Sequence, residues 1–365
     1  MVHPSNELYG ADRVLLEVLD TISELYEVEV WLPNDVPYPR NLLGKALEAR
    51  GIQYRVVSLP VFRRVYATPK HLPSLGLRLA VSSFMLFKFR PQVVYVNTAA
   101  LASLIPIARL SGAEVVLHLH EYLQGVQRKV LLPLVRSANR VISVSNAVRE
   151  SLDSRTQSKT TVIYNGFALP EPTVMSSTEV LTFVVASRWN SWKGHATLLA
   201  AWNLISREDA RLVILGAAPP SGEGVNVHEL VAALARPESV TILGEQDDVR
   251  EILNDCHVVV IPSIRPDPLP TIAIEAAAAG RPAIASRSGG LPEIVLDGRT
   301  GWLFEPGDAH ALACAIDSVD SSSLQRMSKE SRIRYETVFA KSTFDSEILS
   351  YFGQRANRSE RHLND

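Results

Sequence analysis

The chain has 365 residues, enough for two domains of about 150–180 residues rather than for one ordinary hydrophobic core. Hydrophobic residues make up 46% and charged residues 21%, as in globular proteins, and a net charge of −2 excludes a general attraction for nucleic acid. The two cysteines, Cys256 and Cys314, lack metal-ligand spacing and favour a reducing, cytoplasmic setting. We expect no signal peptide, and no membrane-spanning helix because no uninterrupted apolar run reaches 18 residues.

The first half of the chain is expected to form a parallel sheet with helices on both faces. Only Val2 and His3 are left for an opening strand before the turn at Tyr9-Gly10-Ala11, so this strand is either trimmed or a stub. After a helix over 11–25, β-branched runs alternate with segments of helical periodicity, which is the pattern of βαβ units. The strands are expected at 28–32, 54–59, 93–97, 115–119, 140–144 and 161–164, and the helices at 42–50, 75–89, 100–111, 128–137 and 147–152.

Charge is unevenly distributed in this half. Between Glu48 and Glu114 there is no acidic residue, whereas nine basic residues occur there. Within this region, residues 75–89 (LGLRLAVSSFMLFKF) are apolar with basic residues at intervals. A basic, apolar helix face can dock on an anionic membrane surface, at about 1 kcal/mol for each Lys or Arg near the surface. The alternative is an ordinary core helix with basic ends.

The second half begins after a segment from Leu169 to Thr178 that is rich in Pro and Ser, which indicates a linker. A second α/β run follows, and residues 331–352 have helical periodicity. Residues after Gln354 are expected to fray. The strands of this run are expected at 181–186, 211–215, 240–243, 257–262, 282–286 and 301–304.

The most informative stretch runs from Asp255 to Pro306. It predicts a buried strand, a Pro-rich loop and an Ala-rich helix over 271–279, followed by another strand and a Gly-Gly loop. A helix start and a Gly-Gly loop offer backbone N–H groups to phosphate, and the carboxylates of Asp267 and Glu275 can accept hydrogen bonds from sugar hydroxyls. Because open α/β sheets bind ligands at the carboxyl ends of their strands, this stretch suits a sugar joined to a phosphate.

In the same stretch, the spacing of Asp267-x7-Glu275, of Gly289-Gly290-x-Pro-Glu293 and of Asp297-Gly-x-x-Gly301 resembles that of the family-4 glycosyltransferases. The resemblance implies a GT-B fold and a retaining enzyme that uses a nucleotide-sugar donor. The family signature is Glu-x-Phe-Gly-x4-Glu. Glu275 matches its last residue, whereas this chain has Asp267, Leu269 and Pro270 where the signature has Glu, Phe and Gly. The Pro-Leu-Pro variant resembles a group associated with bacterial surface polysaccharides.

The resemblance also implies donor-binding roles. Arg188 and Lys193, after the first strand of the second half, are expected to bind the donor phosphates, because a guanidinium fork and an ammonium suit a diphosphate; the alternative is a solvated loop. Glu275 is expected to hold ribose hydroxyls, and Asp267 to contact the donor sugar as a catalytic residue. The further donor-binding candidates are Gly10, Leu269, Pro270 and Thr271.

In the first half, the motif His118-Leu-His-Glu-Tyr122 ends a strand, and on a strand His118 and His120 point to the same side. The resemblance implies that His120 lies against the donor sugar and the acceptor as a catalytic residue. His118, Glu121, Asn97 and Asn146 are candidates for the acceptor side. A metal site is the alternative use of two His and a Glu, but no third ligand is suggested by the spacing, so we expect no metal and no other cofactor.

The strand and helix patterns predict an α/β protein with two Rossmann-like, doubly wound domains, and the resemblance implies that these face each other across a cleft. The expected domains are an acceptor-side domain (1–168), a linker (169–179), a nucleotide-sugar-binding domain (180–335) and C-terminal helices that return to the first domain (336–365). The absence of Gly-x-Gly-x-x-Gly and P-loop motifs weighs against dehydrogenases and kinases.

The expected function is glycosyl transfer from a nucleotide sugar to a glycan or lipid-linked acceptor, in bacterial surface polysaccharide or glycolipid synthesis. The protein is expected in the cytoplasm, with an anionic membrane surface as a further partner and no nucleic acid. The alternatives are a nucleotide-sugar 2-epimerase of the same architecture and a non-catalytic sugar-nucleotide-binding protein. The sequence names neither the base and sugar of the donor, nor the acceptor, nor the oligomeric state.

Overall fold

The computed structural model describes residues 1–63, 69–169, 175, 180–219, 224–246 and 248–353. The chain divides into two compact units. Unit 1 comprises Met1–Phe167 and Lys341–Asp365, and unit 2 comprises Ala168–Ala340. Each unit is described by itself below. Most of the expected linker, and every residue after Gly353, lie outside the described residues.

Unit 1 contains a parallel sheet in which Val2 stands at the place of the expected opening strand (the Val2 stub). Val2 forms one parallel bridge to Trp31 and one to Val96, and so joins a two-stranded part of the sheet to a four-stranded part. The order across the sheet is therefore β2-β1-Val2-β3-β4-β5-β6, with parallel pairing wherever two strands meet. The strands are β1 (Glu29–Pro33), β2 (Gln53–Val57), β3 (Val93–Asn97), β4 (Glu114–Leu119), β5 (Arg140–Ser143) and β6 (Thr160–Val162).

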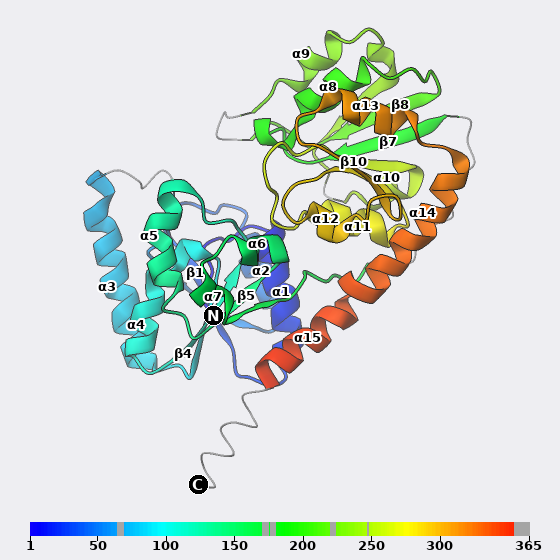
Figure 1. Ribbon diagram of the computed structural model, residues 1–365. Helices are drawn as coiled ribbons and strands as arrows, with labels where there is room; N and C mark the ends of the chain where they lie inside the picture. Colours follow the sequence, from blue (N-terminus) through cyan, green and yellow to red (C-terminus); the bar gives the residue numbers. More distant parts are fainter. Residues whose placement is uncertain (64–68, 170–174, 176–179, 220–223, 247, 354–365) are drawn as a thin grey trace. The chain divides into compact units, whose positions relative to one another are not determined.

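Helices cover this sheet (Figure 1). The first, α1 (Gly10–Ile22), starts with a capping box between Tyr9 and Asp12, and it buries apolar residues at the 3–4 residue spacing of an amphipathic helix. The last, α15 (Lys341–Gly353), returns to pack on α1, although more than 300 residues separate them in the chain. The other helices are α2 (Leu42–Ala49), α3 (Leu72–Phe89), α4 (Leu104–Leu110), α5 (Gly125–Val135), α6 (Asn146–Glu150) and α7 (Ser154–Gln157), with single turns η2 (Pro69–His71) and η3 (Ala99–Leu101).

One helix bears on the expectation that no helix spans a membrane. Among the described residues, α3 is long and apolar enough to cross a membrane by length and composition, with 18 residues and a mean hydropathy of 1.2. Arg78 and Lys88 interrupt the apolar run, but they do not lower its average enough to exclude such a helix. Only 11% of α3 is buried, and it lies beside α4 at the edge of unit 1 (Figure 1).

Unit 2 contains a six-stranded parallel sheet in the order β12-β11-β10-β7-β8-β9. Counted from β7, this is the strand order of the doubly wound dinucleotide-binding fold, in which the strand order reverses between the first and fourth strands, here β7 and β10. The strands are β7 (Leu181–Ala186), β8 (Ala210–Leu215), β9 (Val240–Gly244), β10 (Val258–Ile261), β11 (Ala283–Ser286) and β12 (Gly301–Phe304).

The core of unit 2 lies between this sheet and its helices. Phe183, Trp202, Val258, Ile284 and Leu312 are among its fully buried members. The helices are α8 (His195–Trp202), α9 (Val227–Ala232), α10 (Arg250–Asp255), α11 (Thr271–Ala278), α12 (Leu291–Ile294), α13 (Ala309–Asp317) and α14 (Ser321–Arg334), with single turns η4 (Ser191–Lys193) and η5 (Pro237–Ser239) and a π-helical turn η6 (Tyr335–Phe339). The expected α/β architecture with two doubly wound domains is therefore confirmed.

Candidate functional site

The candidate donor site lies in unit 2, at the carboxyl ends of β7 and β10. These two parallel strands pair side by side, and the strand order reverses between them, which is where doubly wound sheets bind ligands. Arg188 lies in the loop after β7, and Asp267 in the loop after β10. The backbone joins these loops directly, since the amide of Ile264 donates to the carbonyl of Trp192 at 2.8 Å.

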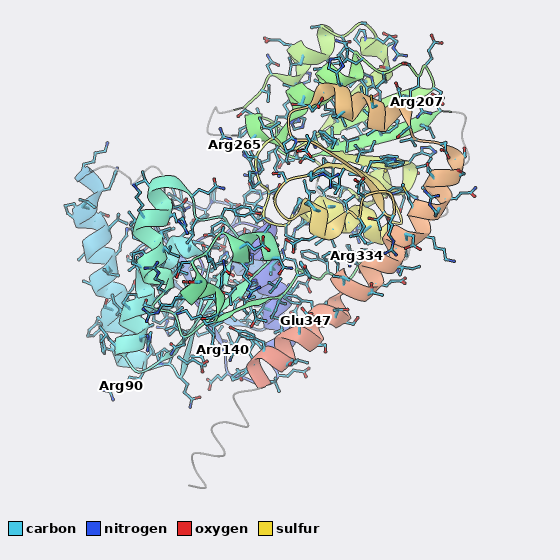
Figure 2. The ribbon with its side chains drawn as sticks, viewed as in Figure 1. Arg90, Arg140, Arg207, Arg265, Arg334 and Glu347 are labelled. Carbon is cyan, nitrogen blue, oxygen red and sulfur yellow. The ribbon has the colours of Figure 1, made fainter. Side chains whose placement is uncertain are left out.

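Two of the sequence-predicted residues meet at this edge. The Nζ atom of Lys193 lies 2.5 Å from the Oδ2 atom of Asp267, whose side chain is only 9% exposed. Lys193 also lies over the ring of Trp192, at 4.2 Å from its centroid. Arg188 is exposed, as is Arg265 on the loop after β10, which Figure 2 labels. The site thus holds cations together with one carboxylate that is paired to a lysine.

Close backbone packing shapes this edge. A Cβ atom on Gly194 would lie 1.8 Å from the carbonyl oxygen of Pro262, and one on Gly290 would lie 2.1 Å from that of Pro268. The amide of Gly290 donates to the carbonyl of Asp267 at 2.8 Å. The Gly-Gly loop is therefore used to hold the Asp267 loop in place, a role that the sequence did not reveal.

Several buried polar atoms at the same edge have no hydrogen-bond partner among the described residues. They are Nε1 of Trp189, both ring nitrogens of His195, Oγ of Ser263 and Oγ of Ser286. They belong to the segments after β7 and β10 and to the end of β11, three neighbouring strands. Burial, with a smaller contribution from Lys193, lowers the pKa of His195 to about 4, so this imidazole is neutral. Unsatisfied buried polar groups are rare in folded proteins, so water, an ion or a polar ligand is expected to pair with these atoms.

The helix α11 carries the remaining donor candidates of unit 2. Pro270 precedes its first residue, Thr271, and Glu275 lies one turn further on, half-buried. Leu269 is buried, with 6% exposure, so its side chain serves packing and only its backbone can contact a ligand. The helix start and Glu275 lie next to the Asp267 loop along the chain, as the spacing of the motif requires.

Gly10, the remaining donor candidate, belongs to unit 1. It is exposed and begins α1, and a Cβ atom added to it would meet nothing within 4 Å. Its backbone is not among the glycines with positive φ. The fold itself therefore does not require glycine at position 10. A requirement for glycine there would come from contact with a ligand.

The predicted histidines of unit 1 lie at its corresponding edge. The rings of His118 and His120 are 4.0 Å apart, on one side of β4. His118 is fully buried and its Nδ1 atom shares a hydrogen bond with the hydroxyl of Tyr95, while burial holds its pKa well below the usual range. His120 is partly exposed, and burial, helped by His3, lowers its pKa to about 3. Of the two histidines, only His120 is reachable from solvent.

A buried polar network holds His120. Its Nε2 atom lies 2.8 Å from Oδ1 of Asn97, and Nδ2 of Asn97 lies 2.8 Å from Nδ1 of His3. The Nε2 atom of His3 lies 2.5 Å from Oδ1 of Asp12 on α1. Asn97 was a sequence candidate, but His3 and Asp12 were missed, because only the sheet brings the first residues beside β3.

Glu121 and Asn146 have structural partners. The carboxylate of Glu121 accepts the amide of Ala99 at 2.7 Å and that of His120 at 3.0 Å, and burial raises its pKa to about 7. It therefore braces the turn after β4 against the turn after β3. Asn146 begins α6 and donates to the hydroxyl of Tyr164 at 2.9 Å. Among the described residues, no group of three or more His, Cys, Asp or Glu is placed to hold a metal ion.

Comparisons with known proteins match both halves of the chain. The family model described as "Glycosyltransferase Family 4" matches residues 9–169, and that described as "Glycosyl transferases group 1" matches residues 179–320. N-acetyl-alpha-D-glucosaminyl L-malate synthase of Bacillus anthracis is 34% identical over 30% of this chain and 28% of its own length. Alpha-maltose-1-phosphate synthase of Mycolicibacterium smegmatis is 31% identical over 51% of this chain and 54% of its own. The match thus spans about half or less of these curated relatives.

The fold also matches solved structures over nearly the whole chain. The Anabaena protein HepE in complex with UDP superposes with a TM-score of 0.82 at 21% identity, covering 97% of this chain and 98% of HepE. Sucrose-phosphate synthase from Thermosynechococcus elongatus superposes with a TM-score of 0.76 at 19% identity, covering 96% of this chain and 94% of that one. At these identities the likeness concerns the fold.

Proposed function

This chain belongs to the family-4 type of glycosyltransferases and has their GT-B fold, and we propose that it transfers a glycosyl group from a nucleotide-sugar donor to a glycan or lipid-linked acceptor. Unit 2 binds the donor, and the histidine edge of unit 1 serves the acceptor side. The proposal extends to retention of the anomeric configuration and to a role in the synthesis of a bacterial surface polysaccharide or glycolipid.

One observation carries the donor site. Where the strand order of unit 2 reverses, the Lys193–Asp267 ion pair lies on the same edge as buried polar atoms that have no partner among the described residues. A nucleoside diphosphate sugar suits this edge, because its phosphates and hydroxyls can pair with buried donors and acceptors. Glu275 on α11 provides the carboxylate for the ribose hydroxyls.

The same residues support the chemistry. When the bond between the sugar and the phosphate breaks, negative charge builds on the leaving phosphate oxygen, and fixed cations stabilise it. Arg188 and Lys193 supply these cations, so the proposed reaction needs no metal ion. Retention then follows from attack on the same face of the sugar, assisted by the leaving phosphate, with Asp267 and His120 as catalytic residues.

A thermal-shift screen against UDP-, GDP-, ADP- and dTDP-sugars in the presence of EDTA tests the donor site. UDP-glucose is the first ligand to try, because a structure of HepE with UDP-glucose has been solved. At a hundred times its Kd, a ligand adds about 2.7 kcal/mol of stability, a shift of roughly 5–10 °C for a unit of this size. The shift should disappear in Arg188→Ala and Glu275→Ala and persist in Arg211→Ala, an exposed arginine on β8. No shift with any donor would contradict the proposal.

Turnover separates a transferase from the alternatives. With a donor that binds, we expect slow release of free sugar and rapid transfer once an acceptor from a bacterial glycolipid extract is added. Proton NMR of the product should show the anomeric configuration of the donor. Conversion of the donor to its 2-epimer without any acceptor would favour the epimerase alternative instead, and binding without turnover would favour a non-catalytic protein.

We further propose that unit 1 binds an anionic membrane surface through α3, and that the protein works at the cytoplasmic face of the membrane. Leu77, Val81 and Phe84 follow one another at helical spacing on the exposed side of α3, with exposures of 68%, 38% and 68%. Lys88 continues the same stripe, and Arg90, labelled in Figure 2, follows the end of the helix. Apolar groups with flanking cations suit the interface of an anionic bilayer.

Cosedimentation with lipid vesicles tests this surface. We expect binding to vesicles of phosphatidylcholine mixed with phosphatidylglycerol, weaker binding at high salt, and little binding to phosphatidylcholine alone. Phe84→Ser should weaken binding, whereas Leu349→Ser, at an exposed apolar position on α15, should not. Equal binding of wild type and Phe84→Ser would contradict a role for α3.

A further inference from the structure

The histidine network of unit 1 lies where the strand order of its sheet reverses. Counted from the Val2 stub, the strand order of unit 1 reverses between Val2 and β3, as it does between β7 and β10 in unit 2. His3 directly follows the stub, and Asn97 is the last residue of β3. The two residues on either side of this switch point are therefore joined by a hydrogen bond, with Asp12 and His120 at the two ends of the chain of contacts.

The hydrogen bonds of this network all point the same way, each residue donating to the next from His120 toward Asp12. The carbonyl of Ala11 lies 3.3 Å from Nδ2 of Asn97, and since a carbonyl cannot donate, Nδ2 must be the amide nitrogen. The same nitrogen then donates to Nδ1 of His3, so His3 carries its proton on Nε2 and donates it to Asp12. Oδ1 of Asn97 can only accept, so His120 must carry its proton on Nε2 as well.

All residues of the network are buried except His120, which is partly exposed. His3 and Asn97 are fully buried, and Asp12 is 3% exposed. The second oxygen of Asp12 accepts the amide of Tyr9 at 2.8 Å, which fixes the carboxylate at the start of α1. The backbone adds a further constraint, because Thr98, directly after Asn97, has a φ of +79°, a conformation that costs energy for a β-branched residue.

We propose that His3 and Asp12 are positioning residues that set the tautomer of His120, so that this imidazole presents an unprotonated Nδ1 atom to the substrate. His120 then accepts a hydrogen bond from a sugar or acceptor hydroxyl and does not donate one. This inference rests on the proposed function for the identity of the substrate, but the tautomer itself is a property of the free protein. Asp12 acts over three hydrogen bonds, in the way that a buried carboxylate orients an imidazole in hydrolase triads.

The structure indicates what an amide at position 12 would do. In Asp12→Asn the Tyr9 amide requires the side-chain oxygen, so the new nitrogen has to face Nε2 of His3 and donate to it. His3 would then carry its proton on Nδ1, which conflicts with the donating nitrogen of Asn97. Relief of this conflict requires Asn97 to turn over, which gives up its 3.3 Å hydrogen bond to the Ala11 carbonyl, and to donate to Nε2 of His120. The substitution should therefore reverse the tautomer of His120, three hydrogen bonds away.

Nitrogen-15 NMR of the imidazoles in the whole protein tests this without any substrate. The His120 signals are assigned from their loss in His120→Gln, because the chain has 9 histidines. We expect wild type to show a protonated Nε2 and an unprotonated Nδ1 in both His3 and His120. In Asp12→Asn, His120 should change to the opposite tautomer or to a mixture. An unchanged His120 spectrum in Asp12→Asn would overturn the proposal, even if the signals of His3 move.

The kinetic arm uses a matched control. Asp20→Asn makes the same change on the exposed side of α1, where Asp20 pairs with Arg50. With UDP-glucose or whichever donor binds, Asp12→Asn should lower kcat about ten- to a hundredfold with little change in the KM of the donor, and Asp20→Asn should leave both unchanged. If no donor is turned over by wild type, the proposed function fails, while the NMR result still decides the network. A fall in kcat without a tautomer change would assign Asp12 a merely structural role.

Discussion

At the scale of single residues, the ion pair between Lys193 and Asp267 shapes the candidate donor site. Both residues were expected to contact the donor, one through phosphate and the other through the sugar. In the structure they neutralise each other, which keeps a nearly buried carboxylate paired. Lys193 is therefore held in place by Asp267, and this pair is a structural element of the site as well as a part of its proposed chemistry.

The first prediction concerns the stability that this pair provides. Lys193→Ala should lower the free energy of unfolding by about 1–3 kcal/mol, because it leaves the Asp267 carboxylate buried and without its partner. Lys193→Ala combined with Asp267→Asn should cost less than the sum of the single substitutions. Urea unfolding monitored by fluorescence measures both. Arg299→Ala, in an exposed pair with Glu330, is the control and should change nothing measurable. Additive effects would show that the pair is not coupled.

The second prediction concerns pH and the buried histidine of unit 2. Burial lowers the folded-state pKa of His195 to about 4 from an ordinary value of 6.5, so the unfolded chain takes up a proton that the folded one does not. Stability from this group is complete above pH 6.5 and is lost as the pH falls toward 4, by about 2 kcal/mol between pH 7 and 5. Unfolding in urea at both pH values should show this slope reduced in His195→Gln. An identical slope in the variant would contradict a neutral, buried His195.

At the scale of secondary-structure elements, the loops after the strands shape the donor edge as much as the side chains do. Gly194, between η4 and α8, has a φ of +78° and lies against the backbone of Pro262. Gly10, at the start of α1, has neither constraint. The backbone of the structure therefore requires glycine at position 194 but not at position 10, although each glycine follows a strand of a doubly wound sheet.

The third prediction compares these two glycines. Gly194→Ala should destabilise unit 2 by about 2–4 kcal/mol, because the new Cβ would clash with the Pro262 carbonyl and require a disfavoured backbone conformation. Gly10→Ala should leave the melting temperature unchanged or slightly raised, because α1 accepts a side chain there. If Gly10 contacts the donor phosphates, Gly10→Ala should still lose turnover. A stable and fully active Gly10→Ala protein would remove Gly10 from the proposed site.

At the scale of the whole molecule, the chain returns to unit 1 after completing unit 2. Residues from 341 on belong to unit 1, where Lys341 lies 3.0 Å from Glu17, and Asp345 accepts the hydroxyl of Thr21. Phe352 is 4% exposed and its ring meets those of Tyr26 and Tyr95. The core of unit 1 is therefore closed by a helix from the far end of the chain, so unit 1 can reach its final stability only after the whole chain is made.

The fourth prediction tests this closure. Phe352→Ala should destabilise unit 1 by about 3–5 kcal/mol, the usual cost of a large cavity in a core. Hydrogen exchange followed by mass spectrometry should become faster in α1 and β3 and stay unchanged in the strands of unit 2. Leu349→Ala, at a position with 40% exposure on the same helix, is the control. Faster exchange in both units would mean that they do not unfold separately.

Much of this protein could be predicted from its sequence, because the relevant signals are local. Alternating β-branched strands and amphipathic helices specify a doubly wound fold over short windows of the chain. The Asp267 to Glu275 spacing is likewise local, and it places both carboxylates at one loop and one helix start.

Only the tertiary structure decided which distant residues share an edge. The sheet brings His3 and Asp12 to Asn97 and His120, and nothing in the local sequence marks these four as one network. Exposure is also a tertiary property. The composition of α3 suits a core as well as a surface, and its position at the edge of unit 1 leaves most of it exposed. Local sequence thus determined the elements and their motif, whereas long-range packing decided the partners of each side chain, because those contacts join residues far apart in the chain.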